Sequence, residues 1–423
     1  MNVKMMNVNA ENFRQVFASH NAPYLLKGIL IGVVIGFVVG VFRLILDKTL
    51  QGLFVLYPYM KANPETILYY SVATVVVWLL LVKVVKPLQQ EGNISWWSSL
   101  WRTFVGALLA ICPGIFAGRE GPCIKMGSFI AQGFSEKVFK DSKEDKDIFI
   151  HGGMSAGLAA AFSAPIAGTL FLIEAVGLVV SPLVLFTSLT ASIASVIVTY
   201  FFFGITPCLY VPYVESIPLN YYWTLLIFGI LIGIFCRVFQ FMLNHASDFY
   251  AKLPIPKDWN SIVPLVLVIP IGLAFPRILG GSHDLIAEVS QNSFIEALIH
   301  TPGSTLIGWL ILVAVIRLIF TVISCGATAP TGVFMPILVL GALCGSIYAV
   351  YLTKFALIPE SYYVNFVICG MAAFFAASLK TPFTAVILLV EAVGSVKYVM
   401  PILIVTWIAT ITNEWLNGKS VYK

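Results

Sequence analysis

A charged pair between two glycines interrupts an otherwise apolar part of the sequence. The stretch reads Gly118-Arg119-Glu120-Gly121-Pro122 and separates the apolar runs 105–116 and 123–134. Glycines around the pair, and a proline that would take the first helical position, predict a sharp turn into a helix. The unpaired N–H groups of such a helix start carry partial positive charge, so the turn is a candidate anion-binding site. The alternative is a solvated loop between two spans, but charges deep in apolar sequence are costly and indicate function.

The composition indicates a membrane protein. Hydrophobic residues make up 59% of the 423 positions and charged residues 11%, whereas a soluble domain carries about 25% charged residues. We therefore expect a multi-pass integral membrane protein. The net charge of +5 gives no reason to expect nucleic-acid binding. The seven cysteines show no C-x-x-C spacing and lie mostly in apolar runs, so we expect them to pack, with no disulfide, metal or cofactor.

The N-terminal part of the chain begins with a polar segment, 1–23, which lacks the pattern of a cleavable signal peptide. We expect this segment to be cytoplasmic. The first apolar run, 24–46, is long enough to span a membrane, and a connection rich in Tyr and Pro follows at 57–63.

Prolines break the longest apolar run into pieces. Residues 152–203 contain a single charge, Glu174, and are too long for one crossing. Pro165 and Pro182 cut the run, and the pieces around Pro165 are shorter than the roughly 20 residues that one crossing needs. Short broken helices at membrane depth are tolerated only inside protein or along a cavity. This pattern favours a transporter or channel over a simple bundle.

The sequence contains an internal repeat. Residues 153–177 align without gaps on 370–394, with eleven of 25 positions identical, including Glu174 with Glu391. At an offset of 214 residues, the turn at 118–122 falls on 332–336. Duplicated halves with interrupted helices are typical of transporters whose site lies where the halves meet. We predict an all-α membrane protein with repeats at 24–217 and 218–423, inverted if each half crosses an odd number of times.

Three motifs resemble those of one known family. G-R-E-G-P at 118–122, G-V-F-M-P at 332–336 and G-K-S-V-Y at 418–422 occur in the order found in the chloride channel/transporter (CLC) family. The G-x-x-A-G-L-A-A-A-F-x-A-P-x-A-G stretch at 153–168 is also similar, so the resemblance covers about 24–422. It implies a CLC-type fold and a homodimer with one anion pathway per subunit. We expect this dimer in the cell (inner) membrane, with both termini cytoplasmic.

Members of this family are either chloride channels or exchangers of chloride for protons. The chain ends one residue after Tyr422. We therefore expect the short prokaryotic type, without the cytoplasmic nucleotide-sensing (CBS) domains of larger relatives.

The resemblance also implies roles for individual residues. Glu120 matches the gating glutamate, which competes with the anion and takes up a proton. A carboxylate mimics chloride, and its ionisation in a low dielectric responds to occupancy of the site. Val333 and Phe334 match positions whose backbone N–H groups bind the central anion, and Tyr422 matches the tyrosine whose hydroxyl binds it from the inner side. The other turn residues expected around the anion are Gly118, Arg119, Gly121 and Gly332.

The sequence departs from the family pattern at two places. The family's G-S-G-I-P motif, which supplies a serine hydroxyl to the anion, has no match between residues 86 and 96. Asn93 or Ser95 could replace that donor, although we favour neither, and the inner end of the pathway should be more open or less selective. Many exchangers also carry an acid directly after the residue that matches Glu174, where this chain has Ala175. Glu174 is then the candidate internal acid.

A structural role competes with that interpretation. Glu174 recurs as Glu391, and a glutamate at the same place in both repeats is more simply explained by hydrogen bonds to backbone donors at a helix interface. We favour this explanation for both residues. Proton coupling without the second acid occurs in parts of the family, so its absence weakens the exchanger hypothesis without excluding it.

We predict transmembrane chloride transport by chloride/proton exchange, gated by Glu120. The alternative is a passive voltage- or pH-gated chloride channel, since Glu120 is expected in both kinds. The expected partners are chloride and related anions, protons and membrane lipid. Val333-Phe334 resembles the second motif of the family's chloride transporters rather than that of its fluoride transporters, which implies chloride as the main anion. A remote alternative is an intramembrane serine hydrolase, because 153–157 spells G-x-S-x-G around Ser155. That stretch is helical in pattern, and its repeat copy has Ala372 in place of the serine.

Overall fold

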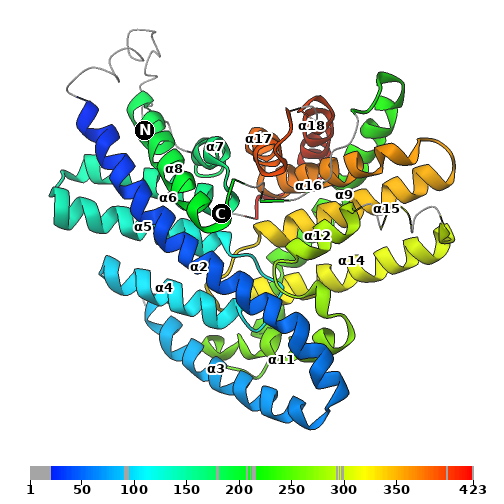
Figure 1. The fold of residues 1–423 in the computed structure, drawn as a ribbon, viewed down its shortest axis with the longest axis horizontal. Coiled ribbons are helices and arrows are strands. Elements are labelled where there is room, and N and C mark those ends of the chain that lie inside the picture. Colours follow the sequence, from blue (N-terminus) through cyan, green and yellow to red (C-terminus); the bar gives the residue numbers. More distant parts are fainter. Residues whose placement is uncertain are drawn as a thin grey trace.

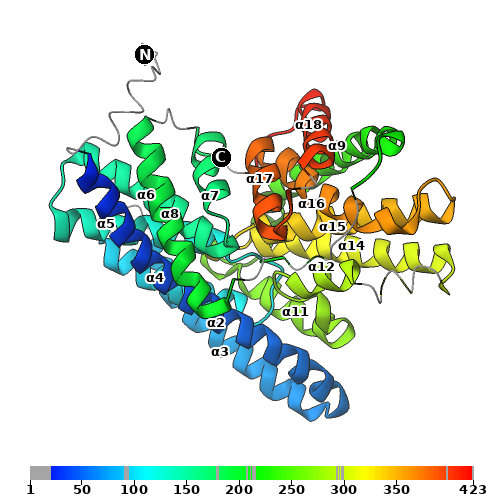
Figure 2. The same ribbon diagram turned by 45° about the horizontal axis from the view of Figure 1, so that its top comes forward.

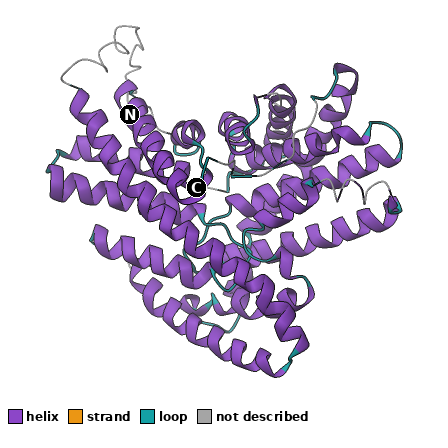
Figure 3. Ribbon diagram, viewed as in Figure 1, coloured by secondary structure: helices purple, strands orange, loops and turns teal. Residues whose placement is uncertain are grey.

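The computed structural model describes residues 21–89, 95–177, 181–205, 208–209, 211, 216–291, 294, 296, 300–396 and 399–421. Figure 3 shows that these residues form helices and connecting loops, without a strand among them. Eight of the described helices are long and apolar enough to cross a membrane, and the protein is a multi-pass membrane protein. The predicted all-α class is therefore confirmed.

The first-half helices are α2 (Ala22–Ala62), α3 (Glu65–Gln89), α4 (Trp96–Ile111), α5 (Glu120–Gly133), α6 (Lys143–Phe162), α7 (Pro165–Glu174) and α8 (Pro182–Phe203), with a π-helical turn at Phe134–Phe139. The second-half helices are α9 (Tyr222–Asn244), α10 (Ala246–Ala251), α11 (Ile262–Ala274), α12 (His283–Ser290), α14 (Gly303–Gly326), α15 (Phe334–Lys354), α16 (Tyr363–Leu379), α17 (Pro382–Val393) and α18 (Val399–Trp415). In Figures 1 and 2, α2 to α8 lie mainly on the left and α14 to α18 on the right.

Each predicted proline break separates two helices. α6 ends at Phe162, the next residue, Ser163, has a left-handed backbone (φ 56°), and α7 begins at Pro165. In the same way α16 ends at Leu379, Lys380 is left-handed (φ 60°), and α17 begins at Pro382. A proline lacks the N–H that a continuing helix would need, but it is tolerated in a first turn. The repeated sequence therefore forms the same broken helix twice.

Helix α2 is longer than the first apolar run suggests. It continues through Pro58 to Ala62, so the stretch rich in Tyr and Pro is helical. The Tyr57 ring lies directly against Gly272 of α11, where a Cβ atom would come within 2.3 Å of it. This packing between helices outweighs the local preference of proline to end a helix.

Glycines allow the closest helix contacts in both halves. A Cβ atom on Gly127 of α5 would lie 2.1 Å from the backbone oxygen of Gly153 on α6. A Cβ atom on Gly341 of α15 would lie 2.3 Å from the oxygen of Gly370 on α16. These are equivalent positions in the repeat, and small residues of this kind let helix backbones touch in membranes. The α5–α6 and α15–α16 pairs therefore hold the two glycine turns at the centre of the molecule.

Candidate anion site

The two predicted turns both lead directly into helices. α5 begins at Glu120 after Arg119, and α15 begins at Phe334 after Val333. Neither preceding residue caps its helix with a side-chain hydrogen bond, and the first N–H groups of a helix have no partner within the helix itself. Pro122 is the third residue of α5, which corrects the predicted first position. The first turn tolerates it there because those N–H groups have no partner within the helix.

The backbones of the two turns are joined to each other. Gly118 N–H donates to the Gly332 oxygen (2.6 Å), and Gly332 N–H donates to the Gly118 oxygen (2.8 Å). A Cβ atom on Gly332 would lie 2.7 Å from the nitrogen of Gly121, and one on Gly121 would lie 2.8 Å from the Thr331 oxygen. Only glycines allow this approach, which brings the starts of α5 and α15 together.

The Glu120 carboxylate lies over these glycines. The residue is 1% exposed, and a Cβ atom on Gly118 would lie 2.1 Å from its Oε2 atom, while one on Gly332 would lie 3.3 Å away. Neither carboxylate oxygen makes a regular hydrogen bond with a described residue, although the N–H groups of Glu120 and Met335 stabilise its charge. The carboxylate thus occupies a small space against two helix starts that favours negative charge.

Aromatic rings surround the start of α15. Phe334 is fully buried, and its ring centroid lies 5.4 Å from that of Phe171, 5.1 Å from that of Phe375 and 6.4 Å from that of Phe162. Val333, directly before it, is also buried. This apolar wall lowers the local dielectric and so strengthens the attraction between a bound anion and the backbone N–H groups.

Arg119 is buried and forms an ion pair with Asp47 of α2. A second buried arginine, Arg43, donates to the backbone oxygen of Ala160 and lies over the Phe203 ring, 4.3 Å from its centroid. Neither Arg43 nor Asp47 was predicted from the sequence to belong to the site. Their position near the end of the first apolar run could have indicated a role in the site, because buried charges in a membrane protein tend to be functional.

A sequence model of the family described as "Voltage gated chloride channel" matches residues 80–414. The chain belongs to this CLC family.

Several curated and solved CLC proteins are similar to the chain. The H(+)/Cl(−) exchange transporter ClcA of Klebsiella pneumoniae is 30% identical over 347 residues, which cover 79% of this chain and 70% of the relative. The ClcA of Yersinia pestis is 29% identical over 347 residues, covering 79% and 69%. The crystal structure of a slow cyanobacterial Cl−/H+ antiporter superposes with a TM-score of 0.78 at 25% identity, covering 94% of this chain and 96% of that one. A CLC-type fluoride/proton antiporter, 20% identical, shares the fold with a TM-score of 0.69, covering 96% and 98%.

The CLC tyrosine position, Tyr422, lies outside the described residues. The residues before it are attached to the C-terminal end of α16: Val421 N–H donates to the Ser378 oxygen (3.1 Å) and the Ser420 hydroxyl to the Leu379 oxygen (3.1 Å). Gly418 N–H donates to the Asn413 oxygen (2.9 Å). These bonds fix the chain immediately before Tyr422 to a fully buried helix.

Glu174 and Glu391 form reciprocal hydrogen bonds between the two halves of this CLC protein. Glu174, at the end of α7, accepts from the N–H groups of Phe383 (3.0 Å) and Thr384 (2.6 Å) at the start of α17. Glu391 of α17 accepts from the N–H groups of Ile166 (3.0 Å) and Ala167 (2.8 Å) at the start of α7. Each carboxylate thus satisfies free donors of the opposite helix start, the structural role that the repeat favoured.

Ser95, one of the two candidates for the missing CLC serine, does not come to the site. Ser95 is exposed, and its hydroxyl accepts from Ser98 N–H (3.3 Å) as the N-cap of α4. This role uses the hydroxyl at a helix start rather than along an anion pathway. Asn93 lies outside the described residues.

Ser155, the candidate hydrolase nucleophile, lies within helix α6 and is completely buried. Its hydroxyl oxygen lies 2.7 Å from that of Ser192 and 3.4 Å from that of Thr169. These contacts join α6 to α8 and α7 through hydroxyl groups, without the strand-to-helix elbow of a serine hydrolase. The relatives are named as transporters, and the protein is not an enzyme.

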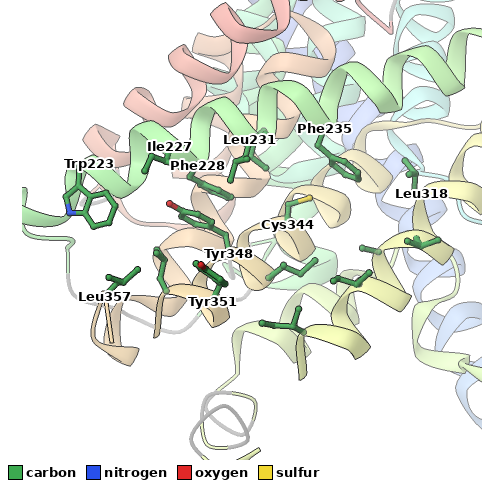
Figure 4. A pocket seen from close by; sticks show the side chains of 17 residues that line it. Trp223, Ile227, Phe228, Leu231, Phe235, Leu318, Cys344, Tyr348, Tyr351 and Leu357 are labelled. Atoms are coloured by element: carbon green, nitrogen blue, oxygen red, sulfur yellow. The ribbon is translucent and has the colours of Figure 1, made fainter. Parts of the chain in front are cut away.

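A cavity of about 600 Å³ lies away from the glycine turns, between α9, α14 and α15. Figure 4 shows Phe228, Leu231 and Tyr348 pointing into it, and the described residues that line it include no charged side chain. An anion that entered this mostly apolar cavity would lose its hydration at a high cost in free energy.

Proposed function

We propose that this CLC protein exchanges chloride for protons across the membrane and that Glu120 is its gate. The observation that carries the proposal is the buried Glu120 carboxylate, which lies against the starts of α5 and α15 without a regular hydrogen bond. As an anion, the carboxylate competes with chloride for the same positive helix ends. When the carboxylate takes up a proton, it loses its charge and is no longer attracted to the helix ends. Chloride then displaces it. Proton uptake and anion binding are thereby linked at one position.

The anion itself would be held by backbone groups. In this proposal the N–H groups of Val333 and Phe334 bind it, with the Tyr422 hydroxyl on the inner side. Gly118, Gly121 and Gly332 keep the two helix starts close enough for one ion to contact both, and Arg119 adds positive potential. The phenylalanine at 334 supports chloride, rather than fluoride, as the main substrate.

The names of the ClcA relatives and of the cyanobacterial antiporter favour exchange over a passive channel. Ala175 stands where many exchangers of the family carry an acid, and Glu174 accepts hydrogen bonds from Phe383 and Thr384. In this proposal the proton reaches Glu120 from the inner side by way of Glu174 or through water.

The decisive experiment uses purified protein in liposomes. An outward chloride gradient should drive protons into the liposomes against their own gradient, as recorded by an internal pH indicator. Clear chloride flux without proton movement would instead identify a passive channel. Replacement of chloride by bromide, nitrate or fluoride in the same assay would then give the anion selectivity.

We further infer that the protein is a homodimer in the cell (inner) membrane, with one pathway per subunit and both termini cytoplasmic. The repeats would be 24–217 and 218–423, after the N-terminal segment 1–23. Exposed apolar side chains on α8 (Ile193, Ile197) and on α17 and α18 (Phe383, Trp407) supply a face for the partner subunit. Single cysteines introduced on this face should cross-link between subunits, whereas cysteines at Leu231 on α9 should not.

A further inference from the structure

The apolar cavity between α9, α14 and α15 is a groove that opens toward the membrane. We call it the α9 groove. On its rim, Ile227 and Leu231 of α9 and Ile311 of α14 are 45%, 48% and 46% exposed, and such apolar side chains on a multi-pass membrane protein face hydrocarbon. On its floor, Phe228 of α9 and Ala314 of α14 are 1% and 7% exposed. The groove therefore has a buried floor and an open, apolar rim.

The α9 groove is about as long as one leaflet of a bilayer is thick. Figure 4 shows Trp223 and Leu357 at one end, and Phe235 and Leu318 toward the other. The stretch of α9 from Trp223 to Phe235 rises about 18 Å at about 1.5 Å per residue. The hydrocarbon core of a bilayer is about 30 Å thick, so one leaflet supplies about 15 Å. A lipid acyl chain of one leaflet thus matches the groove in length.

One end of the α9 groove has the chemistry of a membrane–water interface. Trp223 and Tyr351 lie at this end, and such rings gather at the level of lipid headgroups. Lys354 follows Tyr351 by about one turn in the last turn of α15, and it is exposed. A Cβ atom on Gly303, at the start of α14, would lie 3.0 Å from the Cγ atom of Lys354. Lys354 therefore lies where α14 and α15 meet beside the mouth of the groove.

The Lys354 ammonium group is available to a phosphate. None of the ion pairs among the described residues involves it. Glu296, in the segment before α14, and Glu360, in the segment after α15, are both exposed. These two carboxylates give no reason to expect a headgroup with further negative charge. The phosphate that every phospholipid carries is sufficient for Lys354.

The interior of the α9 groove suits an apolar chain better than water or empty space. The rings of Phe228 and Tyr348 are stacked with their centroids 4.8 Å apart and form a flat wall. Water would find few polar partners on this wall, and empty space would forfeit its dispersion contacts. Lipid chains are as apolar as the wall itself, so a bound chain is held by close packing on these rings rather than by the hydrophobic effect.

We propose that the α9 groove binds one acyl chain of a phospholipid, whose phosphate lies at Lys354. The chain would enter at the Trp223 end and reach toward Phe235 and Leu318. This site does not depend on whether the protein is an exchanger or a channel, and it lies on helices other than α8, α17 and α18, which supply the proposed dimer face.

A photoactivatable lipid tests the position of the chain. Purified protein in detergent is mixed with phosphatidylethanolamine that carries a diazirine near the end of one acyl chain. On irradiation the diazirine loses N2, and the carbene inserts into a nearby bond of the protein. Mass spectrometry should find adducts at Phe235 and Leu318 in excess over Ile234, which is next to Phe235 on α9 but is exposed outside the groove.

Filling the groove should remove these adducts. Ala314→Trp places an indole ring on the floor, so labelling of the inner end should be lost. Ile230→Trp is the matched control, because Ile230 is 47% exposed on α9 and does not line the groove. Lys354→Gln should raise the lipid concentration for half-maximal labelling about fivefold, the value of one lysine near a lipid headgroup. Lys61→Gln, at an exposed lysine in the last turn of α2, should not.

Equal labelling of the inner end and of Ile234 would indicate bulk lipid only and overturn the proposal, as would adducts that persist in Ala314→Trp. If Ala314→Trp does not fold, the comparison within the unmodified protein still decides. Cross-linking between subunits through cysteines at Leu231 would show that a second copy covers the groove, which also overturns it. An unchanged half-maximal concentration in Lys354→Gln would overturn the placement of the phosphate.

Discussion

The two glycine turns share a backbone arrangement but differ in their side chains, since one carries a charged residue and the other an apolar one. Both precede a helix without a side-chain cap, and they are joined by two hydrogen bonds between Gly118 and Gly332. The first turn carries a carboxylate, Glu120, at the position of the helix start where the second turn carries the ring of Phe334. The carboxylate lies over the helix starts, whereas the ring packs among other phenylalanines.

Because of this difference, one turn can supply a gate and the other a fixed wall of the anion site, which two identical turns could not do. Two apolar turns would leave an anion site without a gate, and two carboxylates would repel each other at the place where the helix starts meet. One charged and one apolar copy give a site with a fixed wall and a competing anion. The predictions below test how far the two halves differ, beginning with the largest expected effect.

Glu120→Gln should abolish proton movement and leave chloride flux in liposomes. The amide cannot take up a proton and carries no charge with which to compete for the helix starts. Simultaneous recording of chloride and internal pH measures both. Coupled proton movement that persists in this variant would mean that another group carries the proton and that Glu120 is not the gate.

Gly332→Ala should reduce chloride flux by more than tenfold and lower stability by about 1–3 kcal/mol. The added methyl group would lie 2.7 Å from the nitrogen of Gly121, so the two helix starts must separate. Gly308→Ala in α14 is the matched control, because nothing lies within 4 Å of its Cβ position and alanine favours the helix. Equal flux in the two variants would show that the anion does not need both helix starts.

Glu174→Gln and Glu391→Gln should each lower the free energy of unfolding by about 2 kcal/mol, because each weakens two hydrogen bonds from backbone donors to a carboxylate. Thermal unfolding in detergent measures the loss of stability in each variant. Similar losses of stability with coupling intact in both would limit these residues to a structural role. A loss of proton coupling in Glu174→Gln alone would instead identify Glu174 as the internal acid.

Ser155→Ala should have the smallest effect, about 1 kcal/mol on stability and none on transport, since it removes one buried hydroxyl and its contacts with Ser192 and Thr169. The second half already carries Ala372 at the equivalent position within the buried part of α16. Ser155 in the unmodified protein should also resist a serine-reactive phosphonate. Stoichiometric labelling would reopen the hydrolase hypothesis.

Those features that follow from local chemistry and from the repeat could be predicted from the sequence. The breaks at Pro165 and Pro182 were predicted because a proline cannot continue a helix, and the two turns were matched by their offset alone. The reciprocal bonds of Glu174 and Glu391 were favoured because both copies carry the same acid. Each of these inferences needed only residues close in sequence, or the same residues seen twice.

The contacts of the buried arginines Arg43 and Arg119 could not be predicted in this way. The pairing of Arg119 with Asp47 joins residues 72 positions apart and depends on how α2 crosses α5. Arg43 looked like a charge at the end of a span, and only packing shows that it is buried against Ala160. For the same reason, the helix through Pro58 was missed, because the contact of Tyr57 with Gly272 decides it.

The two hydrogen bonds between Gly118 and Gly332 also bear on the size and the timescale of the movement that opens the site. Many transporters built from repeats open by rocking one half against the other, on microsecond to millisecond timescales. Here the halves are tied together at the site itself, and the Glu120 side chain can leave by rotation about its own bonds. Such rotations take nanoseconds or less once space is available. The slow step of turnover should then be delivery of the proton or dehydration of the anion, and a rigid cross-link between the two halves should leave transport intact.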